Sequence, residues 1–146
     1  MRVADVMQHQ DLVTCSPDTL VADAARRMCE RRVGACLVMD GSQLVGIFTE
    51  RDLLRVVGSG EEVGALPVSQ VMTAKVTLAP PDADLLWTAD TMRRLGVRHL
   101  PVGEDRSMVI GIVSLRDLFA VAEAVLRLDT ENGLKVARDL LGATRE

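Results

Sequence analysis

Apolar and polar positions along this chain follow two different periods, and together they predict a definite order of short elements. Two continuous apolar runs, at residues 35–39 and 44–48, have the length and composition of buried strands. Before them, apolar residues recur at three- and four-residue spacing, which is typical of a helix with one buried side. The predicted order is strand, helix, strand, strand, helix, at residues 11–15, 20–32, 35–39, 44–48 and 49–57.

The same order returns in the second part of the chain, after a polar, glycine-bearing linker at residues 58–67. Here the pattern predicts a strand, a helix, two strands and a helix at residues 76–78, 83–95, 99–103, 108–113 and 115–128. A short amphipathic helix is expected at 134–141 in the tail. At the start of the first helix, Ser16 or Asp18 is the expected N-cap.

Individual residues repeat together with the elements. The pairs that return are Val6-Met7 as Val71-Met72 and Val13-Thr14 as Val76-Thr77. A duplication of this kind predicts that the fold consists of two similar units. We expect one repeat within residues 1–60, a second within 61–128 and a helical tail over 129–146.

Each repeat contains one eight-residue stretch of the same pattern, at residues 46–53 in the first and 111–118 in the second. A glycine and two apolar residues are followed by a hydroxyl residue, any residue, arginine, aspartate and leucine. The apolar residues predict the end of a buried strand that turns directly into a helix. The hydroxyl residue stands where an N-cap belongs, with a carboxylate three residues later.

Two interpretations of these strand-to-helix corners are open. In the first, Thr49 with Asp52 and Ser114 with Asp117 are capping boxes that satisfy backbone N–H groups at a helix start. In the second, the same groups belong to a nucleotide pocket. Helix N-termini attract phosphate, and a fixed carboxylate accepts the hydroxyls of a ribose. The duplication of the whole repeat favours the pocket.

Composition argues against several classes of function. Aromatic residues make up 2% of the chain and the formal net charge is −4, which disfavours nucleic-acid binding. No apolar run reaches the roughly 18 residues of a membrane span, and charges at Arg2 and Asp5 come too early for a signal peptide. We find no nucleophile paired with a base, metal-ligand cluster or Walker loop, so we expect neither an enzyme nor a bound metal.

The three cysteines, Cys15, Cys29 and Cys36, fall on apolar faces of the predicted elements and form no C-x-x-C pair. We expect all three to be buried free thiols. Free thiols are typical of a reducing compartment, so the expected location is the cytoplasm.

The repeated pattern resembles a tandem pair of cystathionine-β-synthase (CBS) domains. The resemblance rests on residues 46–53 and 111–118 and on Arg98-His99-Leu100-Pro101-Val102, and it spans about four-fifths of the chain. It implies an α+β fold in which two β-α-β-β-α repeats pack sheet to sheet with pseudo-twofold symmetry, leaving two clefts between them. It also implies that adenosine ligands such as AMP, ADP, ATP, S-adenosylmethionine or NAD occupy these clefts.

The resemblance implies a role for each candidate residue. The two aspartates hold ribose hydroxyls, one in each cleft, and the two N-cap hydroxyl residues lie near ribose or phosphate. Arg98 and His99, just before Pro101, face the phosphates. The two Val-Thr pairs border the adenine, and Arg116 faces phosphate or solvent. The residues concerned are Val13, Thr14, Thr49, Asp52, Val76, Thr77, Arg98, His99, Pro101, Ser114, Arg116 and Asp117.

The two clefts are not expected to be equivalent. The first repeat has Gly34-Ala35 where the second has Arg98-His99, and it lacks the proline as well. The expected function is a regulatory, signal-transducing module that senses energy or metabolite state by binding AMP, ADP or ATP. The alternatives are a sensor of S-adenosylmethionine or NAD(H), and a dimerisation or partner-docking module without nucleotide. By resemblance we also expect a homodimer formed through helices and an effector protein of unknown identity.

Overall fold

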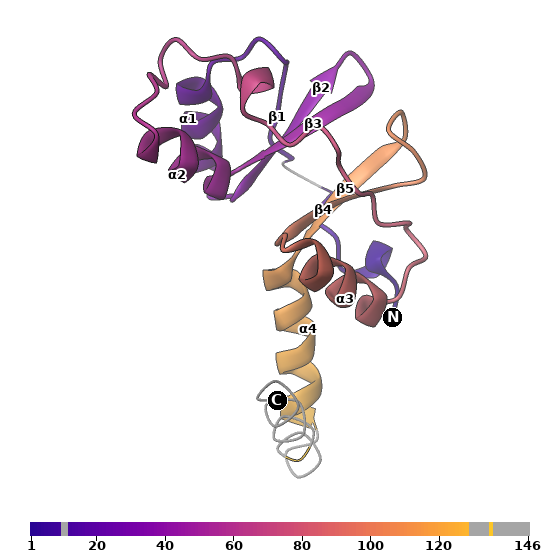
Figure 1. Cartoon of the computed structure of the whole chain (residues 1–146). Coiled ribbons are helices and arrows are strands. Elements are labelled where there is room, and N and C mark those ends of the chain that lie inside the picture. Colours follow the sequence, from indigo (N-terminus) through magenta and orange to yellow (C-terminus); the bar gives the residue numbers. More distant parts are fainter. Residues whose placement is uncertain (10–11, 129–134, 136–146) are drawn as a thin grey trace.

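The computed structural model describes residues 1–9, 12–128 and 135, which form two lobes of helices and strands (Figure 1). Apart from Lys135, the helix expected at 134–141 lies outside the described residues. Within the described part, each lobe contains one small sheet and two α-helices, which confirms the predicted α+β fold.

The first lobe is built on a three-stranded sheet. β1 (Thr14–Cys15) pairs in parallel with β2 (Ala35–Asp40), and β2 pairs antiparallel with β3 (Gln43–Thr49). α1 (Val21–Arg31) connects β1 to β2, and α2 (Glu50–Gly58) follows β3 without an intervening loop. These elements come in the predicted order, with boundaries shifted by a few residues.

The second lobe repeats this arrangement with one strand fewer. α3 (Leu85–Leu95) leads into β4 (His99–Gly103), which pairs antiparallel with β5 (Val109–Ser114). α4 (Leu115–Leu128) follows β5 directly and extends away from the rest of the molecule (Figure 1).

The strand predicted at residues 76–78 is not formed. Instead, Ala79 makes an isolated parallel bridge to Val102, in which the Ala79 N–H donates to the Pro101 carbonyl at 2.8 Å. Pro80 follows directly, and because proline has no N–H it cannot extend the ladder. The sheet of the second lobe therefore consists of β4 and β5 alone.

Two short 3-10 turns cross from one repeat to the other. η1 (Val3–Asp5) places Val3 in the core of the second lobe, and η2 (Val68–Gln70) places Val68 in the core of the first. Figure 1 shows the indigo N-terminal segment beside α3 of the second lobe. The crossing brings Gln8 against β5, where its backbone exchanges hydrogen bonds of 2.7 and 2.9 Å with Ile112.

A shared apolar cluster joins the two sheets. Its buried members come from β2 and β3 of the first lobe, and its half-buried members come from both repeats. The members that meet across the two sheets are Leu37, Leu44 and Ile47 from the first repeat and Val76, Leu78, Val109 and Ile112 from the second. The predicted packing of sheet on sheet is therefore present.

Two local predictions are wrong. The N-cap of α1 is Leu20, because the Ser16 and Asp18 side chains bond to each other in the preceding turn, at 2.5 Å. Cys29 is exposed, because the buried face of α1 is formed by neighbours such as Met28, which point about 100° away around the helix. Cys15 and Cys36 are buried free thiols, as expected.

Candidate ligand-binding cleft

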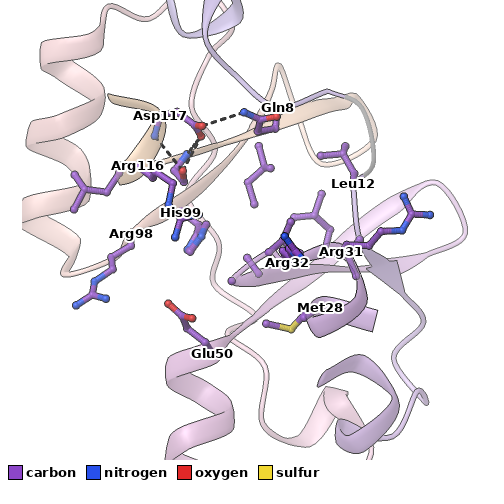
Figure 2. A pocket seen from close by; sticks show the side chains of 18 of the residues that line it. Gln8, Leu12, Met28, Arg31, Arg32, Glu50, Arg98, His99, Arg116 and Asp117 are labelled. Carbon is purple, nitrogen blue, oxygen red and sulfur yellow. Dashed lines mark hydrogen bonds between the residues drawn. The ribbon is translucent and has the colours of Figure 1, made fainter. Parts of the chain in front are cut away.

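A cleft of about 1010 Å³ opens between the two repeats. Half of the sequence-predicted site residues line it, namely Val13, Arg98, His99, Ser114, Arg116 and Asp117. Polar residues that the sequence analysis did not single out also line it, namely Gln8, Arg31, Arg32 and Glu50. Figure 2 shows side chains of the two repeats facing each other across this space.

The Ser114–Asp117 corner holds a carboxylate at the wall of the cleft. Asp117 Oδ2 accepts hydrogen bonds from the Ser114 N–H at 2.8 Å and the Ser114 hydroxyl at 2.7 Å, as a capping box does. The other oxygen, Oδ1, accepts a hydrogen bond from Gln8 Nε2 at 3.0 Å (Figure 2). The two interpretations of this corner are therefore compatible, because one carboxylate oxygen caps α4 while the other bonds outside its own helix.

Gln8 reaches this corner because the N-terminal segment crosses to the second repeat. A signal for it was present in the sequence, since Gln8 directly follows the repeated pair Val6-Met7. Its counterpart Thr73 follows Val71-Met72 and bridges Ile47 as Gln8 bridges Ile112. The sequence repeat therefore marked the position, although not the contact with Asp117.

The equivalent corner in the first repeat is closed. Asp52 Oδ2 accepts from the Thr49 N–H at 2.9 Å and the Thr49 hydroxyl at 3.1 Å, and Arg55 lies 3.5 Å from Oδ1. Asp52 is 4% exposed, and neither it nor Thr49 lines the cleft. Its carboxylate is thus satisfied by its own helix, and a ribose-binding role for Asp52 stays a prediction.

The middle of the cleft brings His99 of the second repeat opposite Glu50 of the first. Gly34 lies between them: a Cβ at this position would meet His99 Cε1 at 3.2 Å and the Glu50 carboxylate carbon at 3.3 Å. Figure 2 shows the Glu50 carboxylate directed towards the strand end that carries Arg98 and His99. A side chain in place of Gly34 would therefore press on both groups.

Burial lowers the pKa of His99 below its ordinary value near 6.5. Glu50 and Asp117 act against this shift, because negative charges favour the protonated imidazole. Arg98 and Arg116 add to the lowering. The imidazole is therefore mainly neutral at pH 7 in the unliganded protein.

Both strand-to-helix corners are anchored to the start of the neighbouring strand. The Leu115 N–H donates to the Arg98 carbonyl at 2.8 Å, and the Glu50 N–H donates to the Gly34 carbonyl at 3.0 Å. These bonds hold the beginning of α4 beside Arg98 and the beginning of α2 beside Gly34. The positions of the charged side chains around the cleft follow from them.

The remaining predicted residues lie elsewhere. Thr14 lines a neighbouring hollow of about 220 Å³ beside Arg27 and Glu30. Val76 packs in the cluster between the sheets, and Pro101 is buried within β4. Thr77 is exposed and does not line the cleft.

Near Val76, two sequence-distant parts of the chain are tied together. Arg106 donates to the carbonyl of Leu44 at 3.4 Å and to that of Ala74 at 3.0 Å. The Leu44 N–H donates in turn to the Arg106 carbonyl at 2.8 Å. Arg106 therefore ties the turn between β4 and β5 to β3 and to the segment that precedes Val76.

Among the residues that the structure describes, no group of three or more histidine, cysteine, aspartate or glutamate side chains is arranged to hold a metal ion. None of their helices combines the length and the apolar character needed to cross a bilayer.

Comparison with known proteins identifies the family. The model of the CBS domain matches this chain twice, at residues 3–59 and 68–124, and the chain therefore belongs to the CBS domain family. The fold is similar to that of a protein with CBS domains from Burkholderia ambifaria MC40-6. The two are 33% identical with a TM-score of 0.79, over 85% of this chain and 95% of that one.

Two solved structures with bound ligands share the fold at lower identity. One is a CBS domain protein of Pyrobaculum aerophilum complexed with AMP. It is 21% identical with a TM-score of 0.73, over 80% of this chain and 89% of that one. The other is the CBS domain pair of protein MJ0100 in complex with 5′-methylthioadenosine and S-adenosylmethionine. It is 22% identical with a TM-score of 0.78, over 85% and 97%.

Proposed function

We propose that this CBS pair is a regulatory, non-catalytic module that binds one adenosine nucleotide, of the AMP, ADP or ATP type, in the cleft beside Asp117. The observation that carries the proposal is the position of Asp117 Oδ1. It lies at the cleft wall, outside the capping interaction, and a ribose hydroxyl would displace or share the hydrogen bond that it accepts from Gln8. A carboxylate that accepts hydroxyl groups forms short, charge-assisted hydrogen bonds and selects a vicinal diol.

The rest of the cleft suits the other parts of such a ligand. Leu12, Val13, Ala35, Leu37 and Ile112 provide apolar walls for a purine. Arg98, His99 and Arg116 provide positive or hydrogen-bonding groups for phosphate, and arginine can donate two bonds to one phosphate at once. Related pairs are complexed with AMP and with sulfur-containing adenosine compounds, which supports an adenosine ligand as the class.

Asymmetry between the corners supports a single occupied site. Asp117 has an oxygen outside its own capping box, whereas Asp52 is buried and bonded within its own helix turn. We therefore place the nucleotide on the Asp117 side only. The module would act in the cytoplasm through an effector protein of unknown identity.

A second candidate function is a docking module whose clefts stay empty. It is favoured by the closed Asp52 corner and by apolar side chains exposed on three helices, with Leu54 72%, Leu86 84% and Phe119 72% exposed. Exposed apolar groups of this size are typical of protein–protein contact. We propose that these helices form a homodimer, which is compatible with either function.

Thermal unfolding in the presence of ligands tests the proposal. AMP, ATP, S-adenosylmethionine and NADH are added separately, and a ligand at about 100 times its dissociation constant should stabilise the fold by roughly 2.7 kcal/mol. Stabilisation by AMP or ATP supports the nucleotide module. Stabilisation by S-adenosylmethionine or NADH alone would replace the nucleotide by that ligand, and no shift with any of them would favour the docking module.

A further inference from the structure

Most described arginine side chains are bonded to other groups of the protein. Those that donate to, or form an ion pair with, a carboxylate or a carbonyl are Arg26, Arg27, Arg51, Arg55, Arg93, Arg94, Arg106 and Arg127. Within residues 1–9 and 12–128, the side chains of Arg32, Arg98 and Arg116 form no hydrogen bond or ion pair, and all three line the cleft. Each guanidinium carries five N–H donors, so these walls hold unused capacity for an anion.

Arg32 stands out among these three because of its backbone. It ends α1 with φ 54° and ψ 41°, and within the described residues it is the one residue other than glycine with a positive φ. This left-handed conformation is energetically unfavourable for any residue that has a Cβ. An unfavourable backbone conformation at the edge of a cleft is typical of a residue whose side chain has a functional role there.

The equivalent position in the second repeat is occupied by glycine. Gly96 ends α3 with φ 65° and ψ 28°, and its N–H bonds to carbonyls of the last helical turn as the N–H of Arg32 does. Arg51 of α2 donates from Nη1 to the Gly96 carbonyl at 2.7 Å and so joins the two repeats on that side. A glycine and a direct hydrogen bond thus close this edge of the molecule.

On the cleft side the corresponding partners are both cations. Arg116 holds the position in its corner that Arg51 holds in the other, and Arg32 replaces Gly96. Both side chains line the same cleft and carry the same charge, and no hydrogen bond joins them in the described chain. An anion between them would supply acceptors to both.

We propose that Arg32 is a phosphate-binding residue contributed by the first repeat, which with Arg116 and Arg98 of the second repeat holds the phosphate of a nucleotide across the cleft. The inference rests on the proposed nucleotide function and extends it. The ligand has to carry phosphate, and the phosphate bridges the two repeats at the edge where the Arg51–Gly96 bond joins them on the other side.

The charge of the cleft separates phosphate from the sulfur-containing ligands. S-adenosylmethionine carries a sulfonium cation next to the ribose, and 5′-methylthioadenosine carries no charge there. Neither would neutralise three guanidinium groups, whereas a phosphate accepts bidentate bonds from arginine. The cleft also contains Glu50 and Asp117, so a bound phosphate has to lie closer to the guanidinium groups than to these carboxylates.

Binding of adenosine, AMP and ATP, measured by titration calorimetry, tests the subsite. Arg32→Asn removes the charge with a residue that tolerates the left-handed conformation, and Arg32→Lys keeps the charge. The control is Arg26→Gln on the exposed side of α1, where Arg26 pairs with Asp23 at 2.7 Å. We expect Arg32→Asn to weaken AMP and ATP binding by about tenfold or more and to leave adenosine binding unchanged. Arg32→Lys should retain part of the affinity, and Arg26→Gln should behave as the wild type.

The remaining outcomes would overturn the phosphate subsite, the proposed function or both. If Arg32→Asn binds AMP as the wild type does, or if the wild type binds adenosine as tightly as AMP, the subsite is wrong and the nucleoside site beside Asp117 stands. If Arg32→Asn weakens adenosine and AMP equally, Arg32 acts on the shape of the cleft and not on phosphate, which also overturns the subsite. If the wild type binds none of the three, both the subsite and the proposed function are wrong.

Discussion

The side-chain amide of Gln8 donates a 3.0 Å hydrogen bond to Asp117, a residue 109 positions further along the chain. The bond joins the N-terminal segment to the corner where β5 becomes α4. It occupies the carboxylate oxygen that the proposed ribose would use, so the ligand hydroxyl has to displace or share it. Gln8 is therefore placed to set the affinity of the site.

Replacing Gln8 by alanine should increase the affinity for AMP by about two- to tenfold, because the ligand hydroxyl no longer has to displace the amide, and an exposed hydrogen bond of this kind contributes about 0.5–1.5 kcal/mol net. Titration calorimetry on the variant and the wild type measures the change. His9 takes part in none of the described hydrogen bonds of Asp117, so His9→Ala serves as the control. Weaker binding in Gln8→Ala would mean that the amide orients the carboxylate instead of competing for it.

The two aspartates of the repeated corners should respond differently to the same substitution. Asp52→Ala removes a buried carboxylate that accepts two hydrogen bonds at the start of α2, and it should lower the free energy of unfolding by about 1–3 kcal/mol. Asp117→Ala should cost less stability, because Asp117 is less buried, but should weaken nucleotide binding tenfold or more. Urea unfolding and calorimetry on both variants separate the effects. Equal losses of affinity would assign a ligand to each corner.

Glycines at the starts of the two corner motifs should also differ in their tolerance of a side chain. A Cβ on Gly111 would lie 2.7 Å from the Gln8 carbonyl oxygen, which is backbone and cannot move without separating the N-terminal segment from β5. Gly111→Ala should therefore destabilise the fold by about 1–3 kcal/mol and disturb the Gln8–Asp117 contact.

Gly46→Ala is the matched comparison. The nearest atoms to a Cβ on Gly46 belong to the flexible side chain of Met72, which can rotate away. Its cost, measured by the same urea unfolding, should be smaller than that of Gly111→Ala. A larger cost at Gly46 would show that Met72 has no alternative position.

Stability should fall on acidification because of His99. Burial lowers the pKa of the folded imidazole below 6.5, so the unfolded chain binds more protons in the window just below that value. The stabilisation is therefore present above pH 6.5 and is lost as the pH falls through the folded pKa. Charges from Glu50, Asp117, Arg98 and Arg116 act on the imidazole, and all are retained in His99→Gln.

Chemical unfolding between pH 5 and pH 7.5 measures the dependence. His99→Gln should flatten it, whereas His9→Gln, at an exposed position, should leave it unchanged. An identical slope in wild type and His99→Gln would assign the acid sensitivity to other groups. Binding of a phosphate beside His99 should raise its pKa again and so be accompanied by proton uptake.

The sequence alone determined the duplication, the order of strands and helices, and the identity of the two corners. These features depend on local patterns: apolar runs for β2 and β3, helical spacing for α1, and a hydroxyl residue followed by a carboxylate at the start of α2. Local backbone preferences and capping bonds act over a few residues, so they can be read directly. Arg98 and His99 could be assigned to the site only through the resemblance to the CBS family.

Tertiary structure decided which corner faces an open cleft. Asp52 and Asp117 have almost the same local sequence. Asp117 lines the cleft and accepts a hydrogen bond from Gln8, whereas Asp52 bonds within the first turn of its own helix. The left-handed backbone of Arg32 and its place in the same cleft as Arg116 likewise could not be predicted from the sequence. These differences depend on contacts between residues that are tens of positions apart, and such contacts are set by packing between the two repeats, not by any local pattern.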